Sequence, residues 1–192
     1  MTNNSGEELQ VRDEESTARG LQNQDPEAWA EVYEEYFPRV YRYIALRVGD
    51  KTEAEDLAGQ VFLKALESIS SFKWRGVPVS AWLFRIAHNH VIDYRRTNKA
   101  KLHLPLDESL VSTDLDPVSE AERNLDISQV VQAVEQLTQA QRDVIELRFA
   151  GGLSTAEVAK VLGKSQGAVK VLQHSALIAL RRRLSSGGNC EE

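Results

Sequence analysis

Three side chains near the C-terminus, Lys170, Val171 and His174, have the types and spacing needed to read a nucleic acid. At 100° per residue they fall within about 100° of one another on a helix. The opposite face of that helix would carry Val169, Leu172, Ala176 and Leu180. A cation, a methyl-bearing side chain and an imidazole near a helix N-terminus can contact phosphates and base edges in a major groove. We therefore take Ser165, Gly167, Lys170, Val171 and His174 as candidate DNA-binding residues.

The residues just before this helix fit a helix-turn-helix. Ala159, Gly163 and Val169 stand at relative offsets of 0, 4 and 10, which suits a small residue in the first helix, a turn glycine and an apolar residue packing back. An ordinary helical hairpin with a solvated face is the alternative, because this spacing also arises by chance.

A second candidate site lies in the N-terminal half. In the segment WLFRIAHNHVIDYRR, the side chains of Trp82, Ile86, Asn89, Asp93 and Arg96 form one helical stripe that is apolar at its start and polar at its end. The preceding loop, residues 71–80, places aromatic groups beside cations, a combination that suits unstacked single-stranded bases. The candidate residues here are Phe72, Lys73, Trp74, Arg75, Asn89, Asp93, Arg95 and Arg96. Packing of Phe72 and Trp74 into the end of the domain is the alternative.

The charge is distributed in blocks. The formal net charge is −6, yet Val158 to Arg183 holds six cations and no acid, and Arg85 to Lys101 holds five cations against Asp93 alone. Residues 101–135 carry two basic and eight acidic groups. The two positive blocks indicate two local sites for a polyanion, which the acidic total conceals.

Apolar residues recur with a 3.6-residue period, and no segment alternates as a strand would. We expect helices from about 26 to 48 (kinked or restarted at Pro38), 52–69, 80–97, 119–137, 138–150, 154–162 and 165–184. Capping boxes are expected at Thr52–Glu55, Ser119–Glu122, Thr138–Gln141 and Ser154–Glu157. The fold class is all-α, with two small helical domains joined by an acidic linker. The boundaries are a disordered tail 1–25, a first domain 26–98, a linker 99–118, a second domain 119–184 and a C-terminal tail 185–192.

Several function classes are disfavoured. The one cysteine, Cys190, can form neither an internal disulfide nor a cysteine-based metal cluster. His88 and His90 lie about 200° apart on the expected helix, so they cannot share a metal ion. We expect no enzyme activity, no metal and no cofactor. The N-terminal residues have no apolar core, and no run approaches a membrane span, so we expect a cytoplasmic protein without membrane insertion.

The strings Ala54-Glu55-Asp56-Leu57 and Val61-Phe62-Leu63-Lys64-Ala65 lie on one expected helix, ahead of the Trp82 stripe and the helix-turn-helix. With these motifs in this order, the chain resembles the extracytoplasmic function (ECF) sigma factors of bacterial RNA polymerase. The two strings resemble the helix that grips core polymerase. Trp82-Leu83, Arg85-Ile86-Ala87, Asn89, Asp93 and Arg96 are similar to the helix that melts the promoter and reads the −10 element. Leu137 to Leu184 resembles the −35-reading domain. Gly59 and Ser175 depart from the usual family pattern.

The resemblance implies contacts to core polymerase through Glu55, Asp56, Leu57 and Phe62. It implies as partners core RNA polymerase, promoter DNA (duplex and melted strand) and an anti-sigma factor. Two other interpretations remain: a helix-turn-helix regulator whose N-terminal domain dimerises, and a protein-binding helical adaptor. The aromatic and basic loop argues against the first, and the cation-rich last helix argues against the second.

Overall fold

The computed structural model describes residues 14–72, 77–98 and 129–187, and every regular element in these ranges is helical. The order is a helix at 14–22, α2 (Pro26–Val48), α3 (Lys51–Ser68), the short 3₁₀ helix η1 (Ile69–Ser71) and α4 (Val79–Thr97). A second group follows: a helix at 129–135, α6 (Gln139–Ile145), the π-helical turn η3 (Glu146–Ala150), α7 (Thr155–Leu162) and α8 (Gln166–Gly187). The expected all-α class is confirmed. None of the helices in these ranges is both long and apolar enough to cross a membrane.

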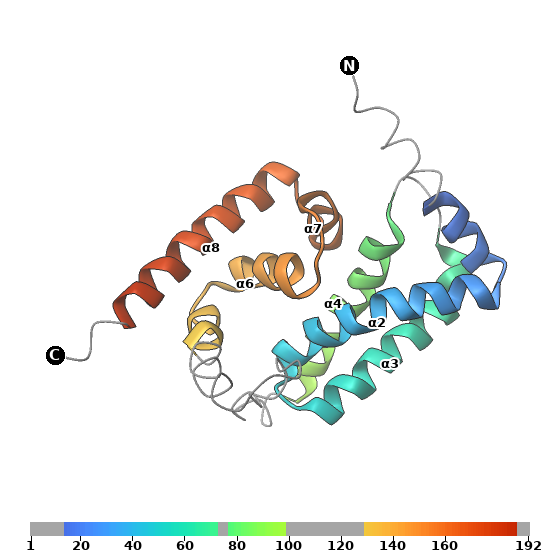
Figure 1. The fold of residues 1–192 in the computed structure, drawn as a ribbon, viewed down its shortest axis with the longest axis horizontal. Helices are drawn as coiled ribbons and strands as arrows, with labels where there is room; N and C mark the ends of the chain where they lie inside the picture. Colours follow the sequence, from blue (N-terminus) through green and yellow to red (C-terminus); the bar gives the residue numbers. More distant parts are fainter. Residues whose placement is uncertain (1–13, 73–76, 99–128, 188–192) are drawn as a thin grey trace, which may run out of the picture.

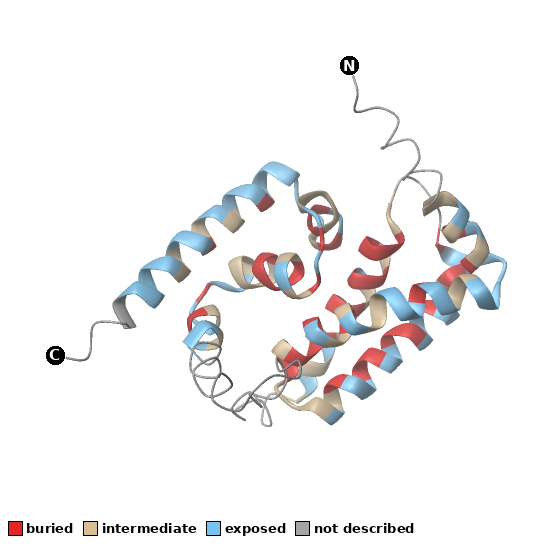
Figure 2. Cartoon of the chain, in the orientation of Figure 1, coloured by how far each residue is buried: buried red, intermediate tan, exposed pale blue. Residues whose placement is uncertain are grey.

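The helices α2, α3 and α4 form the first bundle, with α2 and α3 side by side in Figure 1. Their inward faces supply a core that includes Val40, Ile44, Val61, Phe84 and Val91, all fully buried. The burial pattern of Figure 2, red on one face and pale blue on the other, is that of amphipathic helices packed around a shared interior.

Local signals explain where these helices begin and end. Asp25 caps α2 by accepting a hydrogen bond from the amide of Glu27, and Pro26 occupies the first turn. Gly49 ends α2 in a left-handed conformation with φ 79°. Pro38 lies inside α2, which continues past it as one element. Of the two expected alternatives, a kink or a new helix at Pro38, the new helix was wrong.

Two other expectations in this half were wrong. The start of α3 is capped by Asp50, whose side chain accepts from the amide of Glu53 at 2.8 Å, and not by a Thr52 capping box. Residues 14–22 form a helix that buries Ala18 and Leu21 against the core, although the whole segment 1–25 was expected to be disordered. Two apolar residues one turn apart are too few to show a helical period in a polar sequence.

In the second bundle, capping boxes are confirmed at Thr138–Gln141 and Ser154–Glu157. Gly163 ends α7 with φ 63°, a conformation that favours glycine. The expected capping box at Ser119 and the linker at 99–118 lie outside the described residues. The two bundles also pack against each other, because α7 contacts α4 and η3 contacts α2. Core residues of both belong to one continuous apolar cluster.

Candidate nucleic-acid interface

The helix-turn-helix is formed by α7, the turn at Gly163 and α8. Ala159 and Val169, the two expected packing positions, are buried at the point where the helices meet. Leu153 and Val158 complete the interior of the motif. The expected spacing therefore corresponds to a folded motif whose second helix has a free outer face.

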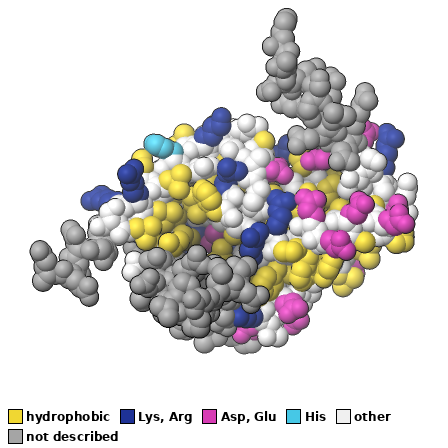
Figure 3. Space-filling view, in the orientation of Figure 1, with side chains coloured by type: hydrophobic (Ala, Val, Ile, Leu, Met, Phe, Trp, Pro, Cys, Tyr) yellow, Lys and Arg dark blue, Asp and Glu magenta, His cyan; other side chains and the backbone are white. Residues whose placement is uncertain are grey.

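The outer face of α8 carries the predicted reading residues. Ser165 starts the helix, its hydroxyl accepting a hydrogen bond from the amide of Ala168 at 3.2 Å. Lys170 and His174 are exposed, and Val171 is 68% exposed. Figure 3 shows basic side chains along this side of the molecule. An exposed valine between a cation and an imidazole has no packing role here, which favours a surface for a ligand.

Two polar contacts that the sequence did not predict hold α8 in place. The side-chain amide of Gln141 donates to the Ser175 hydroxyl at 3.1 Å, and that hydroxyl donates to the carbonyl of Leu172. Arg148 donates to the side chain of Gln173 at 3.2 Å and also to the carbonyl of Leu153. Ser175 thus faces α6, so its departure from the family pattern removes no cation from the outer face.

The polar end of α4 forms the second candidate surface. Asn89, Asp93 and Arg96 are exposed, as the stripe required. Arg96 Nη2 lies 3.1 Å from Asp93 Oδ1 in an exposed ion pair. Such an exposed pair contributes little to stability. Breaking it so that either side chain can bind a ligand therefore costs little free energy.

The loop before α4 differs from expectation. Phe72 is buried and its ring packs on Trp82, with centroids 4.8 Å apart. Its carbonyl accepts a hydrogen bond from Gln22 at 2.5 Å. Phe72 was a candidate for stacking on a base, but burial removes its ring from the surface. Lys73, Trp74 and Arg75 lie outside the described residues.

The environment of Arg95 also differs from the exposed position expected of a DNA-binding residue. Its side chain is half-buried and lines a pocket of about 190 Å³ between the bundles, together with Arg47, Arg142 and Glu146. Burial, followed by the positive charge of Arg47, lowers the pKa of Arg95. The structure therefore places Arg95 at the contact between the bundles.

The candidate polymerase surface is the outer face of α3. Glu55 and Asp56 are exposed, whereas Leu57 and Phe62 are buried in the core. Phe62 packs edge-on against Tyr33, with ring centroids 4.9 Å apart. Leu57 and Phe62 thus support the helix from behind and do not reach the surface.

Two apolar side chains on α3 are exposed beside those acids. Leu63 is 55% exposed and Leu66 is 43% exposed. An exposed apolar pair next to acidic groups is typical of a protein-binding surface.

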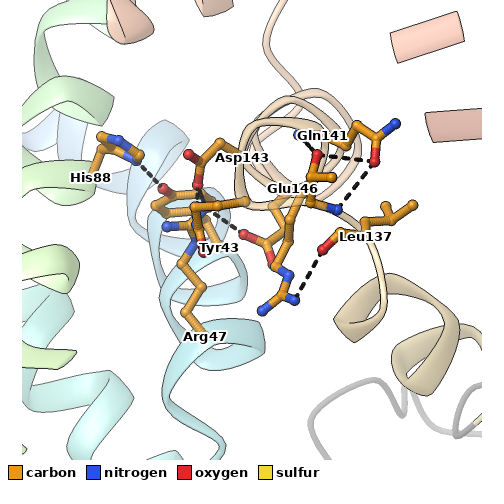
Figure 4. Close-up of polar contacts among 10 residues, drawn as sticks. Tyr43, Arg47, His88, Leu137, Gln141, Asp143 and Glu146 are labelled. Carbon is orange, nitrogen blue, oxygen red and sulfur yellow. Dashed lines mark hydrogen bonds and ion pairs between the residues drawn. The ribbon is translucent and has the colours of Figure 1, made fainter. Parts of the chain in front are cut away.

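A polar cluster between the bundles is shown in Figure 4, and sequence reasoning missed all of it. Arg47 from α2 forms ion pairs with Asp143 and Glu146 of the second bundle, each with a nitrogen–oxygen distance of 2.5 Å. The Arg47 guanidinium also lies 4.7 Å from the ring centroid of Tyr43. Burial raises the pKa of Glu146, while Arg47 opposes that shift.

Among the described residues no group of three or more histidine, cysteine, aspartate or glutamate side chains could hold a metal ion. His88 bonds to Tyr43, whereas His90 contacts Lys64 and Gln60. The two histidines therefore have separate surroundings.

Comparison with known proteins places the chain in a family. Residues 32–101 match the family model described as Sigma-70 region 2, and residues 133–182 match Sigma-70, region 4. The ECF RNA polymerase sigma factor BldN of Streptomyces coelicolor is 38% identical over 162 residues, which cover 83% of this chain and 61% of BldN. SigL of Mycobacterium tuberculosis is 31% identical, with 82% of this chain and 89% of SigL covered.

A solved structure shows a similar fold. The sigma factor RpoE of Bartonella quintana, in complex with the anti-sigma factor NepR, gives a TM-score of 0.61 at 24% identity, covering 81% of this chain and 96% of that one. The chain belongs to the ECF family of RNA polymerase sigma factors.

Proposed function

We propose that this chain binds core RNA polymerase, directs it to promoters through their −35 and −10 elements, and promotes melting of the DNA. The observation that carries this proposal is one chain with two separate exposed polar surfaces. The face of α8 with Lys170 and His174 suits duplex DNA, and the end of α4 with Asn89 and Arg96 suits the −10 element.

The chemistry required is binding, not catalysis. A melted promoter is stabilised by a protein that holds unpaired bases more tightly than paired ones. Asn89 can hydrogen-bond a base edge, and Arg96 can hold the strand backbone, with Lys73, Trp74 and Arg75 in the loop as further candidates. No enzyme activity is proposed. Because the template is the chromosome, the proposed site of action is the cytoplasm.

Core polymerase is proposed to dock on α3. Glu55 and Asp56 are exposed for a basic partner surface, and Leu63 and Leu66 add apolar area beside them. Leu57 and Phe62 act from the interior, by fixing the helix that carries these groups.

An anti-sigma factor is a further proposed partner. The related fold of RpoE is seen bound to such a protein, and the pocket between the bundles combines apolar side chains such as Val130 and Phe149 with the cations Arg95 and Arg142. A partner that occupied this pocket would contact both bundles at once.

The direct test is promoter binding with and without core polymerase. A sigma factor shifts promoter DNA with high specificity only together with core enzyme, whereas a self-sufficient helix-turn-helix regulator shifts it alone. A helical adaptor would shift it in neither case.

A variant tests the docking surface. Asp56→Arg is expected to abolish co-purification with core polymerase, because it reverses a charge at the proposed contact. Glu31→Arg, the same reversal of charge at an exposed site on α2, is the matched control and should co-purify normally. Equal co-purification of both variants would show that α3 is not the docking surface.

A further inference from the structure

The two bundles meet through a contact that is both buried and charged. The Arg47 side chain is only 1% exposed, and the partners of its ion pairs, Asp143 and Glu146, come from the other bundle. A buried ion pair offsets the cost of removing its charges from water only while the two groups stay in close contact. Removing one partner leaves an uncompensated buried charge. The association of the bundles therefore combines an apolar contact with this particular set of buried charges.

Contacts on either side of the ion pairs show that the two surfaces are shaped for each other. Arg39 of α2 donates to the carbonyls of Gly151 and Gly152, at 3.0 and 3.1 Å, where η3 ends. A Cβ atom at Gly151 would lie 2.7 Å from the Phe84 ring, so only glycine permits this approach. The hydroxyl of Ser80, at the start of α4, donates to the carboxylate of Glu157 on α7.

This closed arrangement conflicts with simultaneous reading of both promoter elements. Elements centred at −10 and −35 are about 25 base pairs apart, which is roughly 85 Å of B-DNA at 3.4 Å per pair. A compact body of about 140 residues has a radius of gyration near 15 Å and is roughly 40 Å across. The surfaces on α4 and α8 cannot span that distance while the bundles remain together.

The α4–α7 contact adds a second obstacle. Ser80 stands at the end of the loop proposed to hold melted DNA, and its partner Glu157 is an acid. A carboxylate at this position repels the phosphates of an incoming strand. Closure therefore disfavours DNA binding at the α4 surface, in addition to keeping the α4 and α8 surfaces too close together to reach both promoter elements.

We propose that Arg47, Asp143 and Glu146 form an interdomain latch that keeps the free chain closed, and that the latch opens when core polymerase and promoter DNA engage the two bundles. The assignment of an inhibitory role rests on the proposed function. The closure itself is a property of the free chain and can be measured without polymerase.

The composition of the latch suits a reversible contact. Nε and Nη1 of Arg47 are buried and have no hydrogen-bond partner among the described residues, and opening the contact lets water solvate the side chains of Arg47, Asp143 and Glu146. An apolar contact of the same extent would resist opening more strongly. A partner that binds only the open form has its affinity reduced by the fraction of open chains, and this is how the latch would inhibit.

The test measures the separation of the bundles in the full chain. Fluorescent labels are placed at two exposed positions, Ser16→Cys on the first bundle and Arg181→Cys on the second, in a Cys190→Ser background. Arg47→Met and, from the other side, Asp143→Asn with Glu146→Gln are each expected to lower energy transfer in the free chain at least twofold. Arg39→Ala, which alters a more accessible contact, should lower it less, and Arg19→Ala, which breaks an exposed ion pair within one helix, should not change it.

A triple variant distinguishes opening of the contact between the bundles from damage to the fold. Arg47→Met with Glu146→Met and Asp143→Asn replaces the buried charges by apolar and neutral groups, a change that buried ion pairs tolerate. It is expected to restore high energy transfer, yet to support less transcription than the wild type because it opens less readily. Circular dichroism confirms that every variant measured is helical, and Asp143→Asn with Glu146→Gln provides the test if Arg47→Met does not fold.

The outcomes distinguish the two proposals. If folded Arg47→Met, or the folded double variant Asp143→Asn with Glu146→Gln, retains wild-type energy transfer, the latch is wrong whatever the function of the chain. If energy transfer in the wild type stays high in a complex with core polymerase and promoter DNA, opening is not required and the inhibitory role is wrong. A wild-type chain that closes as expected but binds neither polymerase nor promoter would overturn the proposed function alone.

Discussion

The hydroxyl of Tyr43 lies 2.8 Å from Nδ1 of His88, in the core between α2 and α4. Burial raises the pKa of Tyr43 above its usual value, so the phenol keeps its proton and donates. Burial, and then the nearby Arg47 guanidinium, lower the pKa of His88 below 6.5. The imidazole is therefore neutral, accepts at Nδ1 and carries its proton on Nε2.

This pair predicts a pH dependence of stability. Because the pKa of His88 is lower in the folded chain than in the unfolded chain, the unfolded chain binds more protons as the pH falls below 6.5. The free energy of unfolding is expected to decrease from pH 6.5 downward, by at most about 1.4 kcal/mol per pH unit from this one group. Urea denaturation at pH 7.5, 6.5 and 5.5 measures it.

His88→Asn is the informative variant, since an asparagine oxygen can accept from Tyr43 without titrating. It is expected to be less stable at every pH, and to show a flatter dependence between pH 6.5 and 5.5. Parallel curves for variant and wild type would mean that His88 does not titrate differently on folding.

Gly59 gives a prediction about stability and binding. It lies within α3, it is exposed, and a Cβ at this position would meet no atom within 4 Å. Packing therefore does not require glycine here, and Gly59→Ala is expected to stabilise the chain by about 0.5–1 kcal/mol. Thermal denaturation should show a rise in Tm of about 2–4 °C for 1 kcal/mol in a chain of this size.

The same variant probes the docking surface. If core polymerase approaches the backbone of α3 closely at Gly59, Gly59→Ala weakens co-purification although it strengthens the fold. Gln60→Ala at the neighbouring exposed position is the comparison for binding. A fall in Tm for Gly59→Ala would contradict the assignment of an unstrained helical position.

The sequence was sufficient for features that depend on local spacing. Helical periods, the capping boxes at Thr138 and Ser154, and the turn at Gly163 are determined by residues within a few positions of one another, and they were predicted correctly. The outward orientation of Lys170, Val171 and His174 followed from the same arithmetic.

Features that depend on distant residues could not be predicted in this way. The Phe72 ring packs on Trp82 of α4, and the Phe72 carbonyl accepts a hydrogen bond from Gln22 of the first helix. The sequence of the loop itself contains no signal for either contact. Arg47 occupies a core-facing position where a cation looks misplaced until Asp143 and Glu146, 96 and more positions later, supply its counter-charges. Leu57 and Phe62 were assigned to a surface by resemblance alone, and their periodicity already indicated burial.

The outer face of α8 gives a prediction about sequence specificity. His174→Ala is expected to relax the sequence preference at the −35 element, because an imidazole can contact a base edge. Lys170→Ala should weaken binding uniformly across sequences and reduce the slope of affinity against salt by about one charge, as a phosphate contact does. Competition binding with holoenzyme at several salt concentrations separates the two effects.

Arg42→Ala, a change of the same type at an exposed position on α2, is the control for loss of a single positive charge. Wild-type affinity and wild-type salt slope in both α8 variants would place the DNA on a different face of this helix.

The exposed end of α4 gives a prediction about promoter melting. Asn89→Ala removes a side chain that can hydrogen-bond an unpaired base, while the buried neighbours His88 and Val91 keep the helix in place. The variant is expected to bind the closed promoter with core polymerase but to lose permanganate reactivity of thymines near −10, because holding a flipped base must offset an unstacking cost of a few kcal/mol. A template with a premelted bubble should restore transcription.

Asn23→Ala, at an exposed turn before α2, is the control and should melt the promoter normally. Failure of the bubble template to rescue folded Asn89→Ala would move the melting role from α4 to another surface.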